Sequence, residues 1–149
     1  MAEIGEIKEW RDEQGRRHIR IEGWFRVYPA VRQNRATRWG PRGGSAERYN
    51  ASRALIRDAV ALALKELRMQ PFGPVRLGFA SSFVLCRDKM LGERRRRSVE
   101  TVDLSNLEKA LEDAMIGVLY PDDRWIFARG PGHKQGGPTD RFTVEVWEL

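Results

Sequence analysis

The sequence is poor in the residues that cross-link small proteins or hold transition metals in them. It has one cysteine, Cys86, and two histidines, His18 and His133, among 149 residues. A single cysteine excludes an internal disulfide and any zinc site built from a cysteine cluster. The two histidines lie far apart and do not form the HExxH spacing of zinc proteases. We expect both to face solvent rather than to act as general bases.

Long apolar runs and nucleotide-binding glycine motifs are also lacking. The longest purely aliphatic run covers residues 59–64, which is far shorter than a membrane span requires. The first residues show no basic region followed by an apolar one, so we expect no signal peptide, no membrane segment and a cytoplasmic location. No GxGxxG follows a predicted strand, and GxxxxGK[ST] is missing, which argues against a Rossmann site and a P-loop.

Charge, by contrast, is abundant, and basic residues exceed acidic ones. The chain has 27 Lys and Arg against 21 Asp and Glu, which gives a formal net charge of +6. With 41% hydrophobic and 32% charged residues, the composition is typical of one globular domain spanning residues 1–149. The positive balance favours a polyanionic partner.

Hydrophobic periodicity predicts an α+β fold, with a small mixed sheet packed against two main helices in the order β-β-α-β-α-β-β. The predicted elements are strands at 7–10 and 18–28 joined by a hairpin turn at 12–15, a helix at 49–67, a strand at 75–85 bulged near Ser81, a helix at 105–118, and strands at 125–128 and 142–147. In the last strand we expect Phe142, Val144 and Val146 to face the core.

Two arginine-rich segments have no apolar period and are predicted to be loops. One spans residues 32–48 and the other surrounds residues 94–97; a third loop, 130–138, contains Lys134. The candidate DNA-binding residues in these segments are Arg32, Arg35, Arg38, Trp39, Arg42, Arg94, Arg95, Arg96, Arg97 and Lys134. They could grip phosphates, with Trp39 stacking on a base. Alternatively, the first loop is merely solvated and Trp39 packs back into the core.

Acidic residues gather around the second predicted helix. Asp103 precedes it, Lys109 lies within it, and the adjacent pair Asp122 and Asp123 follows it. Adjacent acids repel unless they are solvated or share a cation, and hard oxygen ligands favour Mg²⁺ or Mn²⁺. Such an ion supports phosphodiester cleavage.

A purely structural interpretation of the same residues is also open. Residues 105–108 fit a capping box with Ser105 as the N-cap, and Asp103 would be stabilised by the helix dipole. Asp122 and Asp123 could then form an ordinary surface turn.

The stretch resembles the signature of the RusA family of Holliday junction resolvases. That signature is D-x-D-N, a Lys three residues after the Asn, D-A-L, a Gly and a paired D-D. The matching residues here are Asp103-Leu104-Ser105-Asn106, Lys109, Asp113-Ala114-Met115, Gly117 and Asp122-Asp123.

The resemblance implies a homodimer, common in phages, that binds four-way DNA junctions and makes paired Mg²⁺-dependent nicks in recombination and repair. Asp103 and Asp123 would be the catalytic metal-binding acids, with Asp122 as an adjacent acid at the metal. Lys109 would stabilise phosphate or help to place the attacking water, and Asn106 would be the amide of the motif.

Ser105 departs from the family pattern, which has an acid at this position. Ser105 could hold the metal through water, another acid such as Asp113 could compensate, or the protein could bind junctions and cleave them poorly. We favour retained activity because the other motif residues are present. The alternatives are a non-catalytic DNA-binding module with a degenerate metal site, and a general or RNA-directed nuclease.

Chain geometry limits how the acids can meet. The predicted helix is about 20 Å long, and the five steps from Val118 to Asp123 reach at most about 17 Å. Asp123 can therefore approach Asp103 only if the chain doubles back along the helix, or if the site is shared across a dimer.

Overall fold

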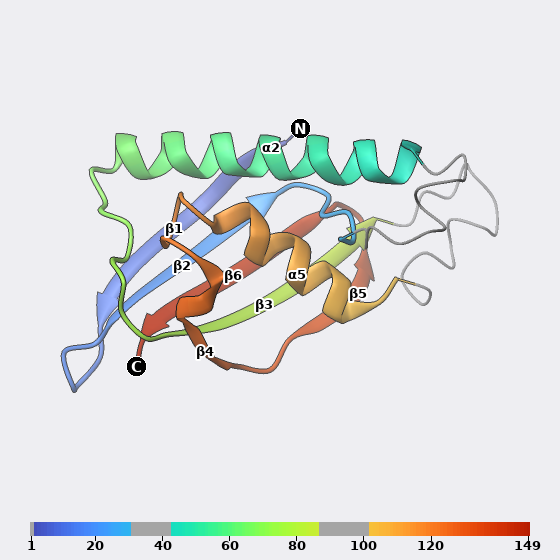
Figure 1. The fold of residues 1–149 in the computed structure, drawn as a ribbon. Helices are drawn as coiled ribbons and strands as arrows, with labels where there is room; N and C mark the ends of the chain where they lie inside the picture. The colour runs from blue at the N-terminus through green and yellow to red at the C-terminus, as the bar shows by residue number, and fades with distance from the viewer. Residues whose placement is uncertain (1, 31–42, 87–101) are drawn as a thin grey trace.

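The computed structural model describes residues 2–30, 43–86 and 102–149, and within these ranges a mixed six-stranded sheet packs against two helices (Figure 1). The elements are β1 (Glu3–Arg11), β2 (Arg17–Trp24), α2 (Gly43–Glu66), β3 (Leu77–Cys86), α5 (Leu104–Met115), the 3₁₀ helix η2 (Asp123–Trp125), β4 (Ile126–Arg129), β5 (His133–Gly137) and β6 (Arg141–Glu148). The predicted α+β class is confirmed, and the element order agrees apart from one additional strand, β5.

The sheet has the strand order β1-β2-β6-β3-β4, and β5 also pairs with β3. β1 and β2 form the predicted antiparallel hairpin, whose turn is closed by a 2.9 Å hydrogen bond from Gly15 N to Asp12 O. Gly15 has φ +78°, a conformation that favours glycine. β4 and β5 run parallel to β3 along its first and second halves. β3 therefore links the hairpin side of the sheet to the segment that follows α5.

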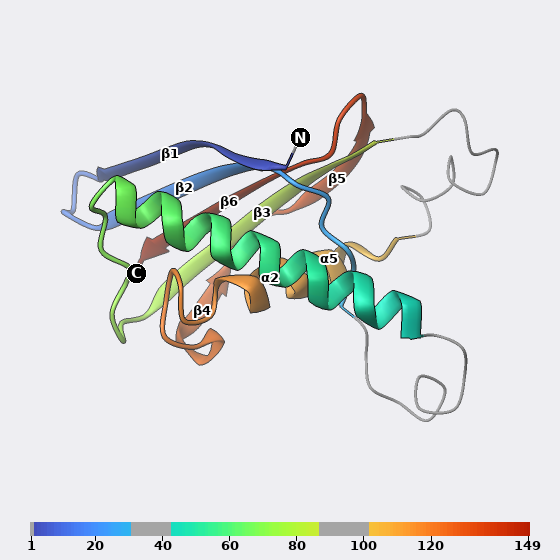
Figure 2. The same ribbon diagram turned by 90° about the horizontal axis from the view of Figure 1, so that it is seen from above.

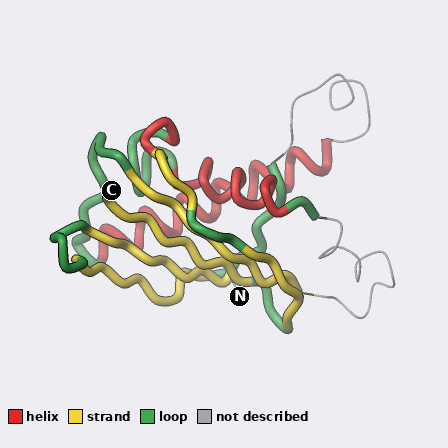
Figure 3. The backbone as a smooth tube through the Cα atoms, turned by 90° about the horizontal axis from the view of Figure 1, so that it is seen from below, coloured by secondary structure: helices red, strands yellow, loops and turns green. Residues whose placement is uncertain are grey.

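Both helices cover the same face of the sheet (Figures 1 and 2), and Figure 3 shows the strands running side by side. Alternate residues of the central strands point toward the helices and are fully buried, including Ile19 and Ile21 of β2. Phe142, Val144 and Val146 of β6 are buried in the same core, which confirms the predicted inward face. The core therefore lies between one face of the sheet and the two helices.

α2 packs on this core through Ile56, Val60 and Leu64. It begins at Gly43, so the prediction that residues up to Arg48 form a loop was wrong for 43–48. Alanine, glutamate and arginine, at positions 46–48, are good helix formers and favour the helix without an apolar period. Among the helices in the described ranges, none is both long enough and apolar enough to cross a membrane.

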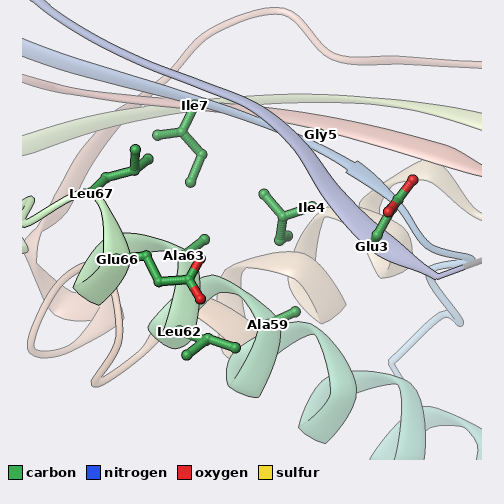
Figure 4. A pocket seen from close by; sticks show the side chains of 9 residues that line it. All are labelled: Glu3, Ile4, Gly5, Ile7, Ala59, Leu62, Ala63, Glu66 and Leu67. Atoms are coloured by element: carbon green, nitrogen blue, oxygen red, sulfur yellow. The ribbon is translucent and has the colours of Figure 1, made fainter.

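A pocket of about 420 Å³ separates α2 from the edge strand β1 (Figure 4). Ile4 and Ile7 of β1 face the helix across it, and Leu62 and Leu67 border it from the helix side. α2 ends at Glu66, one residue before the predicted end, and Leu67 is 53% exposed. None of the signature residues contributes to this pocket.

Two predictions about β3 and its neighbours were wrong. β3 pairs with β6 without a register shift from Leu77 to Val84, so there is no bulge against β6 near Ser81. Residues 133–137, predicted to be part of a loop, form β5 and pair in parallel with Ser82–Cys86. Backbone hydrogen bonds to an available strand edge outweigh the low strand propensity of its glycines.

His18 also differs from the sequence prediction. Its side chain is only 15% exposed and stacks between Trp10 and Trp147, with ring centroids 5.0 and 6.4 Å away. Its ring nitrogens contact Asp12 and Glu145. His18 is therefore a packed residue on the sheet face opposite the helices, whereas His133 is exposed as predicted.

Candidate active site

The amino end of α5 is set by Asp103. This residue is the N-cap, and its Oδ1 accepts hydrogen bonds from Ser105 N at 2.9 Å and from Ser105 Oγ at 2.7 Å. The Ser105 hydroxyl is the main reason that the pKa of Asp103 lies below its usual value. The predicted capping box, with Ser105 as the N-cap, was wrong. Aspartate is an equally good N-cap, and the N-cap lies two residues earlier than predicted, so that the helix begins at Leu104.

Lys109 stands on the exposed side of α5 between two carboxylates. Its Nζ lies 2.8 Å from Asp123 Oδ2 and 3.1 Å from Asp113 Oδ1. The hydrogen bond to Asp123 is the largest cause of a pKa of Lys109 well above its usual value, and the same bond lowers the pKa of Asp123. Lys109 and Asp123 are therefore both charged at neutral pH, and the lysine acts as a fixed cation.

The chain reaches Lys109 from the far end of α5 by doubling back. Gly117, at φ +79°, donates its N–H to Tyr120 O at 2.7 Å, and the buried Tyr120 hydroxyl donates to Glu112 O at 2.7 Å. Asp122 then caps η2, which carries Asp123. The chain therefore doubles back along its own helix, and this brings Asp123 into contact with Lys109. Asp103 and Asp123 are both among the described residues, and no hydrogen bond joins them.

Tyr49 of α2 completes the support of this cluster. Its hydroxyl donates a 2.9 Å hydrogen bond to Asp113 Oδ2, and burial is the main reason that the pKa of Tyr49 is raised. Asp113 is thus held from two sides, by Tyr49 and by Lys109. Sequence reasoning missed Tyr49, because a tyrosine near the start of a helix carries no signal of what it contacts in the fold.

Tyr49, Lys109 and Asp113 line an open pocket of about 520 Å³ beside α5. Asn106, Lys109 and Asp113, which are spaced i, i+3 and i+7 along α5, all border it. The full lining is Ala30, Tyr49, Ser105, Asn106, Glu108, Lys109, Asp113 and Arg129. Four signature residues of α5, Ser105, Asn106, Lys109 and Asp113, therefore share one solvent-accessible cavity.

A second ion pair lies just beneath the pocket. Glu112, which is 3% exposed, binds the Arg129 guanidinium through its Oε2. Burial raises the pKa of Glu112, and Arg129 opposes that rise. Neither residue was singled out from the sequence, because a buried acid on a helix and an arginine on a short strand carry no local signal of pairing.

The predicted DNA-binding residues are only partly placed. Arg32, Arg35, Arg38, Trp39, Arg42 and Arg94, Arg95, Arg96 and Arg97 lie outside the described residues. Lys134, on β5, donates a hydrogen bond from its Nζ to Val102 O, and its charge lowers the pKa of Asp103. Lys134 therefore stands beside the start of α5, close to the first signature acid.

The structure places the predicted metal-binding acids on two different elements, and none of them lines the pocket. Asp103 caps α5, while Asp122 caps η2 and Asp123 is the first residue of η2. Asp122 also accepts from Arg124 N at 3.4 Å. In the part of the chain that the structure describes, no three acidic, histidine or cysteine side chains stand together as a ready metal cluster.

Comparison with known proteins assigns the chain to a family. A search of curated proteins gives no match. The family model for Endodeoxyribonuclease RusA matches residues 26–146, a range that contains every residue that lines the pocket. Because this match covers most of the chain, the protein belongs to the RusA endodeoxyribonuclease family.

Proposed function

We propose that this protein is a Mg²⁺-dependent endonuclease that resolves four-way DNA junctions by paired nicks as a homodimer. The observation that carries the proposal is the contact of Lys109 with Asp113 and Asp123 at an open pocket, in a chain of the RusA family. Two carboxylates around a fixed ammonium form a preorganised charged site of the kind that phosphodiester cleavage requires.

The donor chemistry of the site fits Mg²⁺. Mg²⁺ in proteins is commonly bound by one or two carboxylates and several waters, and in this proposal Asp103 and Asp123 supply carboxylates from α5 and η2 while waters complete the coordination. Asp122 would stand beside them, and Mn²⁺ could substitute. When bound, the ion would stabilise negative charge on the phosphate and make water a better nucleophile.

The chain's own residues have separate tasks in this proposal. Lys109 keeps its proton because both neighbouring carboxylates stabilise its charge, so it serves as a cation for the phosphate and not as a base. Asp113, held by the Tyr49 hydroxyl, orients Lys109. Asn106 borders the same pocket, and its backbone carbonyl accepts a 3.0 Å hydrogen bond from Ala30 N, which ties α5 to the segment that follows β2.

The proposed partner follows from charge and symmetry. A net charge of +6, with arginines concentrated in two segments, suits many phosphate contacts. A four-way junction has approximate two-fold symmetry, and a two-fold dimer would present the same site to two strands. The same reasoning supports a role in DNA recombination and repair.

One observation favours a second candidate, a junction-binding protein that does not cleave. Ser105 replaces the family acid, and both of its hydrogen bonds go to Asp103 Oδ1. The site thereby loses one negative charge and part of the hydrogen-bonding capacity of Asp103. Retained cleavage remains our proposal, because Asp103, Lys109 and Asp123 are all present.

A cleavage assay on a labelled four-way junction, with a linear duplex of the same sequence, tests the proposal. We expect symmetric nicks in the junction only with Mg²⁺, and tighter binding at the lower of two salt concentrations. Asp103→Asn and Asp123→Asn should bind the junction without nicking it, while Asp58→Asn, on the exposed side of α2, should behave as the wild type.

The other outcomes are equally informative. Equal cutting of junction and linear duplex would favour a general nuclease. Tight junction binding without any nicking by the wild type would favour the non-catalytic alternative.

A further inference from the structure

Two ion pairs of opposite polarity join α5 to the segment from η2 to β4. In the first, Lys109 of the helix contacts Asp123 of η2; in the second, Glu112 of the helix contacts Arg129 at the end of β4. Lys109 and Glu112 are three residues apart and therefore neighbours on the helix surface. The four charges sense one another, since Arg129 acts on Asp123 and Lys109 acts on Glu112.

The Glu112 side chain is an unusual occupant of its position. It is 3% exposed and lies on the side of α5 that also buries Leu111 and Met115. A buried carboxylate loses much hydration energy and is tolerated only when it is paired. The family signature specifies no acid at position 112. The buried charge of Glu112 is therefore explained by its ion pair with Arg129.

Arg129 is bound on one side and open on the other. Its guanidinium is held by Glu112 and stands 5.9 Å from the centroid of the Phe79 ring, yet its side chain remains 47% exposed and borders the pocket. A planar guanidinium fixed in this way cannot move without leaving Glu112 unpaired. The pair therefore ties β4 rigidly to α5.

Trp125 and Ile126 pack against the core, but few hydrogen bonds hold the segment that carries Asp123. η2 is a single 3₁₀ turn closed by a 3.3 Å bond from Trp125 N to Asp122 O and by a bond from Ile126 N to Asp123 O. β4 is four residues long, and its pairing with β3 shifts register near its start. A short turn and a short strand leave considerable freedom at Asp123.

We propose that Glu112 and Arg129 form a positioning pair that fixes η2 against α5 and thereby holds Asp123 on Lys109. This inference rests on the proposed nuclease function, because the position of Asp123 matters through its effect on the nicking rate. Neither residue touches the reacting atoms in this role. Displacing a reacting or metal-binding group by about 1 Å can lower a rate roughly 100-fold.

The decisive variant replaces both partners with apolar residues, Glu112→Leu with Arg129→Met. Replacing a buried ion pair by apolar side chains of similar size is often neutral for stability, so this protein should unfold at nearly the wild-type urea concentration. Amide hydrogen exchange at Arg124, Trp125 and Ile126 should nevertheless be several-fold faster. The single-turnover nicking rate should fall by roughly 10–100-fold while junction affinity is unchanged.

Single variants and a matched control complete the test. Arg129→Lys keeps the positive charge. It should show slower amide hydrogen exchange on η2 and a faster nicking rate than Arg129→Gln. Arg124→Met, an exposed change on η2 itself, should match the wild type in nicking. If the double variant does not fold, the lysine and glutamine variants decide the question in its place.

The proposal is overturned if the double variant keeps wild-type exchange on η2 and wild-type nicking, or if the lysine and glutamine variants are equal in both. A wild type that does not nick junctions would refute the proposed function instead. In that case the exchange comparison still shows whether the pair fixes η2.

Discussion

Lys109 Nζ lies 2.8 Å from Asp123 Oδ2, so a single charge-assisted hydrogen bond joins the middle of α5 to the turn before β4. The contact unites two separate parts of the family signature, the lysine and the acid pair. The signature is therefore a three-dimensional arrangement as well as a sequence pattern.

Removing the ammonium should impair cleavage more than folding. Lys109→Met is expected to lower the nicking rate about 10²-fold, because one preorganised positive group is lost where negative charge develops. Lys65→Met, in the exposed last turn of α2, is the matched control and should nick normally. Single-turnover assays on a labelled junction measure the effect, and an unchanged rate in Lys109→Met would show that the lysine has no part in cleavage.

Restoring the family acid should strengthen the response to Mg²⁺. Ser105→Asp adds a carboxylate beside Asp103, so half-maximal nicking should require less Mg²⁺ than in the wild type. Ser105→Ala keeps the wild-type charge and serves as the control, since it removes only the hydroxyl bond to Asp103. Titrations of Mg²⁺ that coincide for the aspartate and alanine variants would contradict this expectation.

A side chain at Gly78 should destabilise the sheet. A Cβ atom there would collide with the Trp147 indole, which lies against this glycine. We expect Gly78→Ala to lower the free energy of unfolding by about 1–3 kcal/mol, as overpacking usually does. Gly73→Ala, whose Cβ would meet nothing within 4 Å, should lower it much less. Urea denaturation of both variants checks the difference.

Stability should depend on pH through Asp12. The hydrogen bond from His18 is the main reason that the pKa of Asp12 lies below its usual value of 3.8. A carboxyl whose pKa is depressed by folding contributes stability that is present above the unfolded pKa and is lost as the pH falls through the folded pKa. Asp12→Asn should therefore be less stable than the wild type at neutral pH, and the difference should vanish below the depressed pKa.

Urea unfolding at several pH values between neutral and strongly acidic measures this difference. Glu13→Gln, an exposed change in the same turn, is the control and should show no comparable difference. A gap between wild type and Asp12→Asn that is constant down to the lowest pH would contradict the role given to the Asp12 carboxylate.

The sequence predicted the α+β class and most elements, because strands such as Phe142–Trp147 alternate clearly between buried and exposed residues. It failed at β5, whose residues His133–Gly137 have weak strand propensity and acquire their structure from the edge of β3. It also failed at the N-cap of α5, where Asp103 and Ser105 are both good capping residues and only the folded backbone distinguishes them.

The candidate site was predictable where it is local. The spacing of Asn106, Lys109 and Asp113 follows from helix geometry and places them on one side. The pairing of Lys109 with Asp123 required the turn at Gly117, and the contribution of Tyr49 required α2 to pack against α5. Contacts of this kind depend on the whole fold and leave no periodic trace in the sequence.

The short path between Lys109 and Asp123 has a consequence for how the protein assembles. These residues are 14 apart in the chain, whereas the contact of His18 with Glu145 spans 127 residues. Closing a short loop costs less conformational entropy than closing a long one, and the charged cluster can form while the outer strands are still unpaired. The Lys109–Asp123 contact is thus encoded in a short stretch of sequence, whereas Tyr49, 64 residues before Asp113, joins the cluster only when α2 packs against α5.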